Sequence, residues 1–500
     1  MPKVIKIPFK ILAVVLGIAL ILLAIAQTGW FKNYITKKAT NYLSKELNTE
    51  VKIDKISLDY FDRLNAYNIL IRDEQKDTMV FIKKLKANYN LKSFSNQLIN
   101  FDKVVLDNSL INLGIYEGQS RLNIQFLIDY FTPPPSAETK ESPILEFDQI
   151  KLINSKFIYF NRNFEAPKDR LFNENDMLFS NLNGSLEDFQ IINDSLNFNI
   201  LGLSGFEKSG LDVQTLKSKT IISRSTMAFR NLLIKTPKST ISNYLKFNYN
   251  SYNDLANFIK VVKIEATLDN AQIHTDDLAL FGESLKSYNE RIKGDGKLEG
   301  TIADLTSNKL NLSIGNHTHF LGYLKLKGLP SIKNTIWNVN ATSLSTNATD
   351  LSRLMEIQNP PSEFLNLGDI KYQGVFKGTI NKFNTKATIT TDLGNIETNL
   401  DYTASSGDIA TYSGKIKSDG FDLENLLSIN DLSTTSFDLD VDGSGFTLET
   451  LKARVNGTIN HFGLKNYNYQ NISVDGTVAN NIYNGGFGID DPNFKLKLKG

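Results

Sequence analysis

The chain has 500 residues, with 55 Lys and Arg against 54 Asp and Glu, four His and no Cys. This length exceeds one ordinary hydrophobic core, so several domains or a repeating body are expected. The balanced charge argues against nucleic acid as a partner, and the lack of Cys excludes disulfides, thiolate metal sites and Cys nucleophiles.

The first thirty residues predict a transmembrane signal anchor, domain 1–30. Three Lys within residues 3–10 precede an apolar run from Ile11 to Ala26, and Trp30 follows where an aromatic belt would lie. From Pro8 the segment holds about 19 residues, or roughly 28 Å of helix, close to the thickness of a bilayer core. The anchor residues are Ile11, Leu12, Val14, Val15, Leu16, Ile18, Leu20, Ile21, Leu22, Leu23 and Trp30.

The positive charge before this run places the N-terminus in the cytoplasm and the remainder outside it. A cleaved signal peptide is the alternative, because Ala24–Ala26 fits a small-x-small cleavage site. Both interpretations export the body. No second apolar run approaches spanning length, so a single-pass topology is expected.

Residues 31–130 predict a module of one helix and a sheet. From Phe31 to Leu47 apolar residues recur at three- and four-residue steps, which predicts an amphipathic helix of about 17 residues ending near Asn48. Its apolar stripe could cap the first sheet, or the helix could lie on the membrane surface with its Lys towards anionic headgroups, and the two arrangements are compatible. Period-two alternation then predicts strands at 51–58, 79–82, 85–89 and 111–115, with a polar turn at 73–77.

The Pro-rich segment 131–143 is expected to be a linker, followed by a repetitive β body over 144–500. Strands in this body have one apolar and one charged face. The apolar positions that would line a groove include Leu324, Leu326, Phe437, Leu439, Val441, Phe494, Leu496 and Leu498. Short helices are predicted at 251–262, 276–289, 350–357 and 421–428. About 30 strands stacked over roughly 140 Å are expected.

A short internal repeat favours a repeating β array. Leu298–Ile302, Phe376–Ile380 and Val455–Ile459 share a Gly-Thr-Ile core, at spacings of 78 and 79 residues. The chain stops at Gly500 as a strand finishes, without the polar closing unit that arrays need. We therefore expect it to be the N-terminal part of a longer protein.

No catalytic or cofactor-binding motif emerges. His317 and His319 have the spacing of metal ligands on a strand, but no third ligand is near in sequence. Gly294, Gly296 and Gly300 miss the spacing of a dinucleotide loop and open a strand. No Gly-x-Ser-x-Gly elbow or Walker sequence occurs. The sequence predicts a protein that is not an enzyme and needs no cofactor.

Two architectures satisfy a sheet with one apolar face. The face either packs on a second sheet in a closed sandwich or curls into an open groove that holds acyl chains. Alternation of apolar and polar residues is the same in both, so periodicity leaves the choice open.

Several segments resemble the AsmA-like and TamB-like proteins of diderm bacteria. They are the anchor, the helix Ile35–Leu43, the stretch Glu50–Leu58, the turn Asp73–Thr78, and the segments Glu207–Leu211 and Asn231–Pro237. The resemblance implies an inner-membrane anchor, a periplasmic body and a mainly β fold, an antiparallel sheet curled into a β-taco groove. The family's C-terminal domain has no visible counterpart.

The resemblance also implies a function in outer-membrane biogenesis. Family members are linked to phospholipid movement toward the outer membrane, and some act with an Omp85-type outer-membrane barrel in assembling or secreting proteins. The leading hypothesis is passive phospholipid transfer along the groove. The alternatives are a scaffold of a translocation and assembly module that templates outer-membrane proteins by β-augmentation, and an anchored sandwich spacer.

Overall fold

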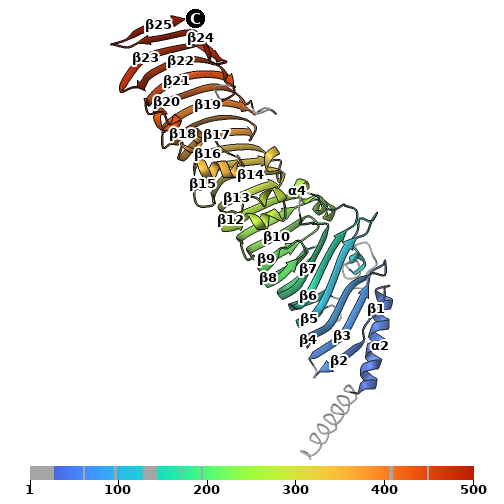
Figure 1. Ribbon diagram of the computed structural model, residues 1–500. Coiled ribbons are helices and arrows are strands. Elements are labelled where there is room, and N and C mark those ends of the chain that lie inside the picture. The colour runs from blue at the N-terminus through green and yellow to red at the C-terminus, as the bar shows by residue number, and fades with distance from the viewer. Residues whose placement is uncertain are drawn as a thin grey trace, which may run out of the picture. The chain divides into compact units, whose positions relative to one another are not determined.

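The computed structural model describes residues 28–59, 62–94, 98–127, 144–168, 171–192, 195–357, 359–404, 409–446 and 450–500. The fold is mainly β, and within each unit the strands lie side by side in an open sheet (Figure 1). Contacts divide the chain into unit 1, Met1–Val261, and unit 2, Val262–Gly500. The predicted anchor residues other than Trp30, and the linker 131–143, lie outside the described residues.

The described part of unit 1 begins with a helix and continues in strands. Its elements are α2 (Gly29–Glu46), β1 (Val51–Lys52), β2 (Lys55–Asp59), β3 (Arg63–Arg72), β4 (Thr78–Phe94), β5 (Leu98–Ile115), β6 (Ile144–Asn161), β7 (Asp176–Ile192), β8 (Ser195–Glu207), β9 (Asp212–Ile222), β10 (Thr226–Lys235), β11 (Thr240–Asn248), η2 (Tyr252–Asn257) and α4 (Phe258–Val261).

Unit 2 consists of strands with short helices between some of them. Its elements are β12 (Lys263–His274), α5 (Thr275–Ala279), η3 (Glu283–Leu285), β13 (Arg291–Thr301), β14 (Asp304–Ile314), β15 (Thr318–Lys327), η4 (Ile332–Asn334), β16 (Ile336–Asn347), α6 (Ala348–Leu354), α7 (Ser362–Leu365), β17 (Asp369–Thr379), β18 (Lys382–Thr391), β19 (Gly394–Thr403), β20 (Thr411–Asp422), α8 (Leu423–Leu427), β21 (Leu432–Ser444), β22 (Lys452–Leu464), β23 (Tyr467–Ala479), β24 (Ile482–Asp490) and β25 (Lys495–Lys499).

Helix α2 confirms the predicted amphipathic helix and packs its apolar stripe on the first strands. Thr28 caps its N-terminus, accepting a hydrogen bond from the Phe31 N–H at 3.3 Å. Ile35 and Ala39 pack against a core that includes Ile56. The side of α2 that carries Ile35 and Ala39 therefore caps the first sheet, whereas Tyr34 and Tyr42 of the predicted stripe are exposed.

Two hydroxyls of α2 also satisfy the backbone of the first strands. The Ile56 N–H donates to Thr36 Oγ1 at 2.9 Å, and that hydroxyl donates to the Lys32 carbonyl at 2.8 Å. Ser44 Oγ donates to the Val51 carbonyl and accepts from the Val51 N–H, both at 3.1 Å. Unpaired edge groups would invite another strand, so α2 protects this part of the sheet from extension.

Among the strand pairings of the described residues of unit 1, one is parallel and the others are antiparallel. Strands β5 and β6 pair in parallel, from Leu98 with Ile144 to Ile115 with Asn161. The expectation of a wholly antiparallel sheet is therefore wrong at this place. A parallel neighbour requires a crossover connection, and residues 116–143 link these two strands.

Strands are longer and fewer than the alternation predicts. Segments 79–82 and 85–89, expected as two strands, belong to the single strand β4. Among described residues, 144–500 contain twenty strands, β6 to β25, and not about thirty. Left-handed Asn within strands explain part of the difference: Asn154, Asn231 and Asn270 have φ of 45°, 51° and 48°, and the pairing register shifts beside each one. Such bulges break the alternation without ending the strand.

The internal repeat is only partly structural. Gly300-Thr301 and Gly378-Thr379 both end a strand before a two-residue hairpin, and each Thr Oγ1 accepts the N–H three residues on, at 3.1 Å. The third copy, at Gly457, lies in the middle of β22. The predicted short helices are found as η2 and α4, α5 and η3, α6, and α8.

Candidate functional site: the apolar face of the sheet

One face of unit 2 is apolar across every described strand. A single row of register partners runs from β12 to β25, and all but one of its members are apolar or Gly. The row is Ala271, Gly294, Leu312, Phe320, Leu344, Tyr372, Ile389, Ile396, Ser418, Phe437, Ile459, Ile472, Ile489 and Leu496. We call this surface, with its flanking rows, the apolar face.

Parallel rows place the other residues expected in the groove on the same face. Leu439 pairs with Ile416 and Gly457, and this row continues to Leu498. Leu324 and Val441 lie in a second row and Leu326 in a third. Phe494 differs, because it lies in the turn before β25 and contacts Tyr469 at a ring-centroid distance of 6.1 Å.

The opposite face of the same strands is charged. Lys415 of β20 and Asp438 of β21 form an ion pair at 2.8 Å, and Lys325 pairs with Asp304 at 3.1 Å. The hydrogen bond to Asp438 raises the pKa of Lys415 above its usual value. A face that carries Lys and Asp at alternate positions belongs in water, so the two sides of the sheet differ sharply in polarity.

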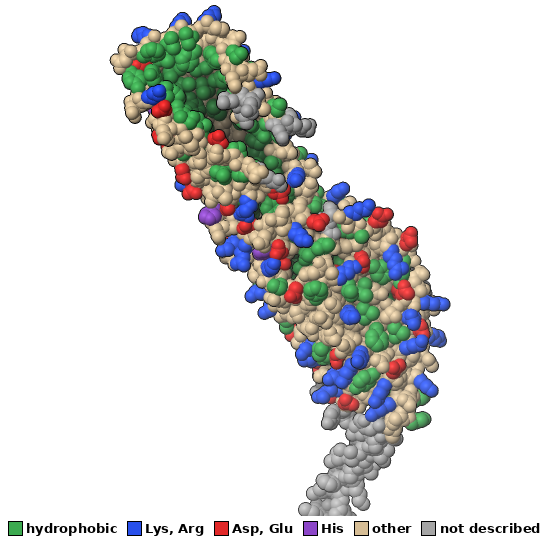
Figure 2. All heavy atoms as spheres, in the orientation of Figure 1, with side chains coloured by type: hydrophobic (Ala, Val, Ile, Leu, Met, Phe, Trp, Pro, Cys, Tyr) green, Lys and Arg blue, Asp and Glu red, His purple; other side chains and the backbone are tan. Residues whose placement is uncertain are grey.

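The apolar face is open. Strands of unit 2 pair with their neighbours in one sheet, and no second sheet covers the face in the part of the chain that the structure describes. Most members of the central row are half-buried, and Leu498, in the flanking row of Leu439, is 54% exposed. Figure 2 shows a hollow lined by hydrophobic side chains where β20–β25 lie. The closed sandwich considered from the sequence is therefore not the arrangement of these strands.

Gly residues permit close approach of neighbouring strands on this face. At Gly414, with φ +144°, a Cβ would lie 2.1 Å from the Asn399 carbonyl oxygen. At Gly457, with φ +146°, it would lie 2.2 Å from the Asp438 carbonyl oxygen. Larger residues are strained at both positions, so Gly here serves the backbone and the apolar face is built by its neighbours.

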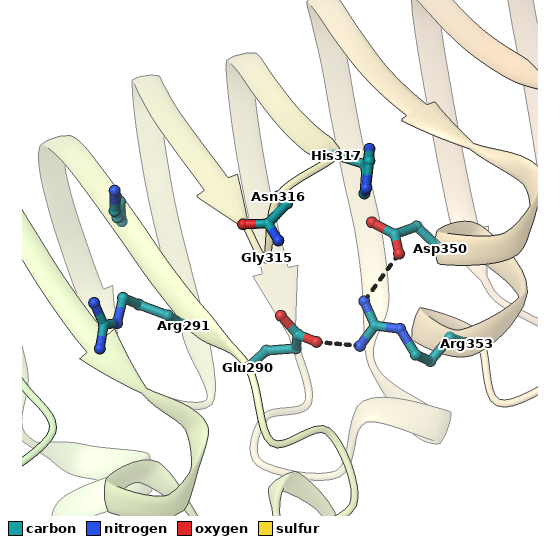
Figure 3. A pocket seen from close by; sticks show the side chains of 8 residues that line it. Glu290, Arg291, Gly315, Asn316, His317, Asp350 and Arg353 are labelled. Carbon is teal, nitrogen blue, oxygen red and sulfur yellow. Dashed lines mark hydrogen bonds and ion pairs between the residues drawn. The ribbon is translucent and has the colours of Figure 1, made fainter.

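A polar pocket of about 500 Å³ lies beside the ends of β13 and β14 (Figure 3). The Arg353 guanidinium donates to Glu290 and, at 3.2 Å, to Asp350. The Arg291 guanidinium points away from this pair, and His317 lies exposed in the turn before β15. Glu290 and Asp350 each pair with Arg353, and Asp350 Oδ2 is buried without a hydrogen-bond partner among the described residues, so the pocket is lined by an ion-pair cluster.

The two histidines singled out from the sequence do not share one face of a strand, because His317 lies in the turn before β15 and His319 lies in β15. His319 Nδ1 lies 2.9 Å from Ser313 Oγ, while His317 belongs to the polar pocket. Within the described residues no group of three His, Cys, Asp or Glu is arranged to hold a metal ion.

Of the predicted anchor, only Trp30 is described, in the first turn of α2 with 73% of its surface exposed. No helix among the described residues combines the length and apolarity needed to cross a bilayer. The anchor thus stays a prediction from the sequence.

Sequence reasoning missed the positions where the apolar face is built from small residues. Strand β18 presents Phe383, Thr385, Ala387 and Ile389 to this side, each paired with a residue of the face on β17 and β19. Thr385 and Ala387 weaken the alternation of apolar and polar residues along β18. The exposed Lys382, Lys386 and Thr388, which alternate with the residues of the apolar face, still show the two-residue period of a strand.

Comparison with known proteins gives no match. No family model fits the sequence, and neither a curated protein nor a solved structure is significantly similar.

Proposed function

We propose that this chain is a membrane-anchored, non-enzymatic carrier of phospholipids. In this proposal the acyl chains lie in a β-taco groove formed by the apolar face, and the headgroups stay in water. The observation that supports it is the row of register partners from Ala271 to Leu496, apolar or Gly at every position but Ser418, which no second sheet covers among the described residues.

The dimensions of the apolar face suit an acyl chain. Four positions per strand, two residues apart at about 3.4 Å per residue, make the face roughly 20 Å wide. Half of a bilayer's hydrocarbon core is about 15 Å thick. Across fourteen described strands of unit 2 the face extends for about 60 Å. Several lipids would fit side by side.

The energetics require no specific residue. Burial contributes about 0.8 kcal/mol per CH₂, so a chain of about 16 carbons gains on the order of 10 kcal/mol when fully covered. Each side chain supplies a small part of this. Passive sliding along the face is therefore the expected mechanism.

The place of action follows from the N-terminal sequence and the family resemblance. The apolar run Ile11–Ala26 would anchor the chain in the inner membrane of a diderm bacterium, with the body in the periplasm. The expected direction is toward the outer membrane, with an Omp85-type barrel as the expected partner at the far side.

The test is lipid extraction and native mass spectrometry of the full chain purified from a diderm host. Wild type should carry several phospholipids. Leu439→Arg puts a charge in the middle of the apolar face and should lose most of them. Asp440→Arg puts the same side chain on the charged face, where residue 440 is exposed, and should leave lipid loading unchanged.

A lipid-free wild-type protein with native circular dichroism would refute lipid carriage. Recovery of nascent barrel proteins in place of lipid would instead support the scaffold function. Equal lipid loading in the two Arg variants would show that the bound lipid lies elsewhere.

A further inference from the structure

Helix α2 has a second face that the sheet does not use. Its packed side carries Ile35, Thr36 and Ala39. The opposite side, which we call the outward face, exposes Trp30, Tyr34, Lys37, Lys38, Tyr42 and Lys45. The exposed fractions of its three aromatic residues are 73%, 51% and 59%, in chain order.

Two of the three aromatic rings of the outward face stack on each other. The rings of Trp30 and Tyr34 stack with centroids 5.9 Å apart, and Lys38 Nζ lies 5.9 Å from the Tyr34 centroid. Tyr42 follows two turns after Tyr34 on the same side. Indole and phenol rings have an apolar body and a polar edge, which suits the headgroup layer of a bilayer.

The charge of this face is one-sided. Lys37, Lys38 and Lys45 are exposed, and Glu46 at the last position is the single acidic residue of the helix. An anionic surface complements three Lys placed between amphipathic rings. A protein–protein interface commonly has an apolar centre, but the aliphatic side chains Ile35 and Ala39 of α2 already pack on the sheet and are not available for one.

The position of α2 in the sequence favours a membrane over an acidic protein. The predicted spanning run ends at Ala26, and α2 begins at Gly29. Its first turn must then lie near the headgroups, whichever way the helix points.

We propose that the outward face of α2 binds an anionic membrane surface, so that the helix lies in the plane of the headgroups. Because α2 covers the backbone of β1 and β2, this docking holds the first strands of the sheet at the bilayer. The inference rests on the anchoring in the proposed function but not on lipid carriage by the apolar face.

The test separates a lying helix from a standing one. Residues 30 and 42 are about 18 Å apart along the axis, whereas the headgroup layer is roughly 5–8 Å thick. Full-length chain with Trp30→Phe, Trp337→Phe and Tyr42→Trp has one reporter, at position 42. The Trp337 Nε1–H is buried and has no hydrogen-bond partner in the described part of the chain, so Trp337→Phe removes no hydrogen bond seen there. The chain is reconstituted in vesicles with or without phosphatidylglycerol, containing headgroup-labelled quencher lipid.

On anionic vesicles the Trp at position 42 should be quenched and its emission shifted to the blue, more weakly on phosphatidylcholine alone. Adding Lys37→Glu and Lys38→Glu should remove most of the quenching. The matched control, Lys497→Glu and Lys499→Glu on the charged face of β25, should leave it unchanged.

A chain that floats with vesicles but whose Trp at position 42 is unquenched would overturn docking and leave lipid carriage standing. Quenching that survives charge reversal on α2, or is equal on neutral vesicles, would overturn the electrostatic recognition. A chain that does not float would overturn both the docking and the anchor. Lipid loading measured on the same samples reports the apolar face separately.

Discussion

Removing one hydroxyl from α2 tests how the helix is fixed to the sheet. Thr36 is 6% exposed, and its Oγ1 accepts from the Ile56 N–H of β2. Thr36→Val keeps the shape and leaves that buried N–H without a partner, at a cost of about 1–3 kcal/mol. If the loss is local, exchange of the Ile56 amide should accelerate roughly 5- to 150-fold.

The same helix offers a matched control. Thr40 lies one turn later, and its Oγ1 is buried without a hydrogen-bond partner among the described residues. Thr40→Val therefore removes a hydroxyl that already lacks a partner and should leave stability unchanged or raise it. The assay is hydrogen exchange of Val51 and Ile56 by mass spectrometry with peptide-level resolution. The reasoning fails if both variants accelerate exchange equally, or if Thr36→Val leaves the Ile56 amide protected.

Three further predictions concern other positions. Asp73 is 2% exposed, and its carboxylate accepts hydrogen bonds from Tyr116 Oη, from Asn123 Nδ2 and from two backbone N–H groups. Asp73→Ala leaves these donors without their acceptor and should lower the free energy of unfolding by about 3 kcal/mol or more. Urea unfolding measures it, and a loss under about 1 kcal/mol would contradict the network. Gly414→Val should open β19–β20 locally, seen as faster amide exchange there and not in β23–β24. The Tyr467 hydroxyl donates to Asp491 at 2.5 Å and, with backbone N–H groups, lowers the pKa of that carboxyl. The stabilisation that the ionised Asp491 carboxyl contributes is complete above its pKa in the unfolded chain, about 4, and is lost as the pH falls through the lowered pKa of the folded protein. Tyr467→Phe should therefore make amide hydrogen exchange in β23–β25 less sensitive to acid.

The fold was largely predictable where sequence period and local structure agree. Helical spacing located α2 to within about two residues at each end. Short helices were expected at 276–289, 350–357 and 421–428, and the structure has α5 with η3, α6, and α8 there. A capping side chain precedes each of the three α-helices: His274 for α5, Asn347 for α6 and Asp422 for α8.

Strand length and strand direction were less predictable. A bulge at a left-handed Asn such as Asn231 shifts the alternation by one residue, which in sequence resembles a turn. The parallel pairing of β5 with β6 depends on the path of residues 116–143, and alternation within a strand carries no information on its neighbour's direction.

For the candidate site, sequence identified the large aliphatic positions but not the continuity of the face. Leu439 and Val441 stand out because Asp438, Asp440 and Asp442 separate them. Their partners Gly457 and Gly414 carry no hydrophobic signal at all, yet both lie in the apolar rows. Only the register of the strands brings such residues together.

The apolar face does not depend on where the Gly-Thr-Ile motif lies within a strand. Gly300 and Gly378 lie beside equivalent hairpins, whereas Gly457 lies in the middle of β22. The row of apolar register partners nevertheless continues across β21 and β22, from Phe437 to Ile459. A surface that holds acyl chains by burial alone needs an apolar side chain of suitable size at each position, and several residue types can meet that requirement. A carrier of the proposed kind would therefore be constrained by the alternation of its strands, and a single charge on the apolar face would disturb it more than the loss of any one aliphatic side chain.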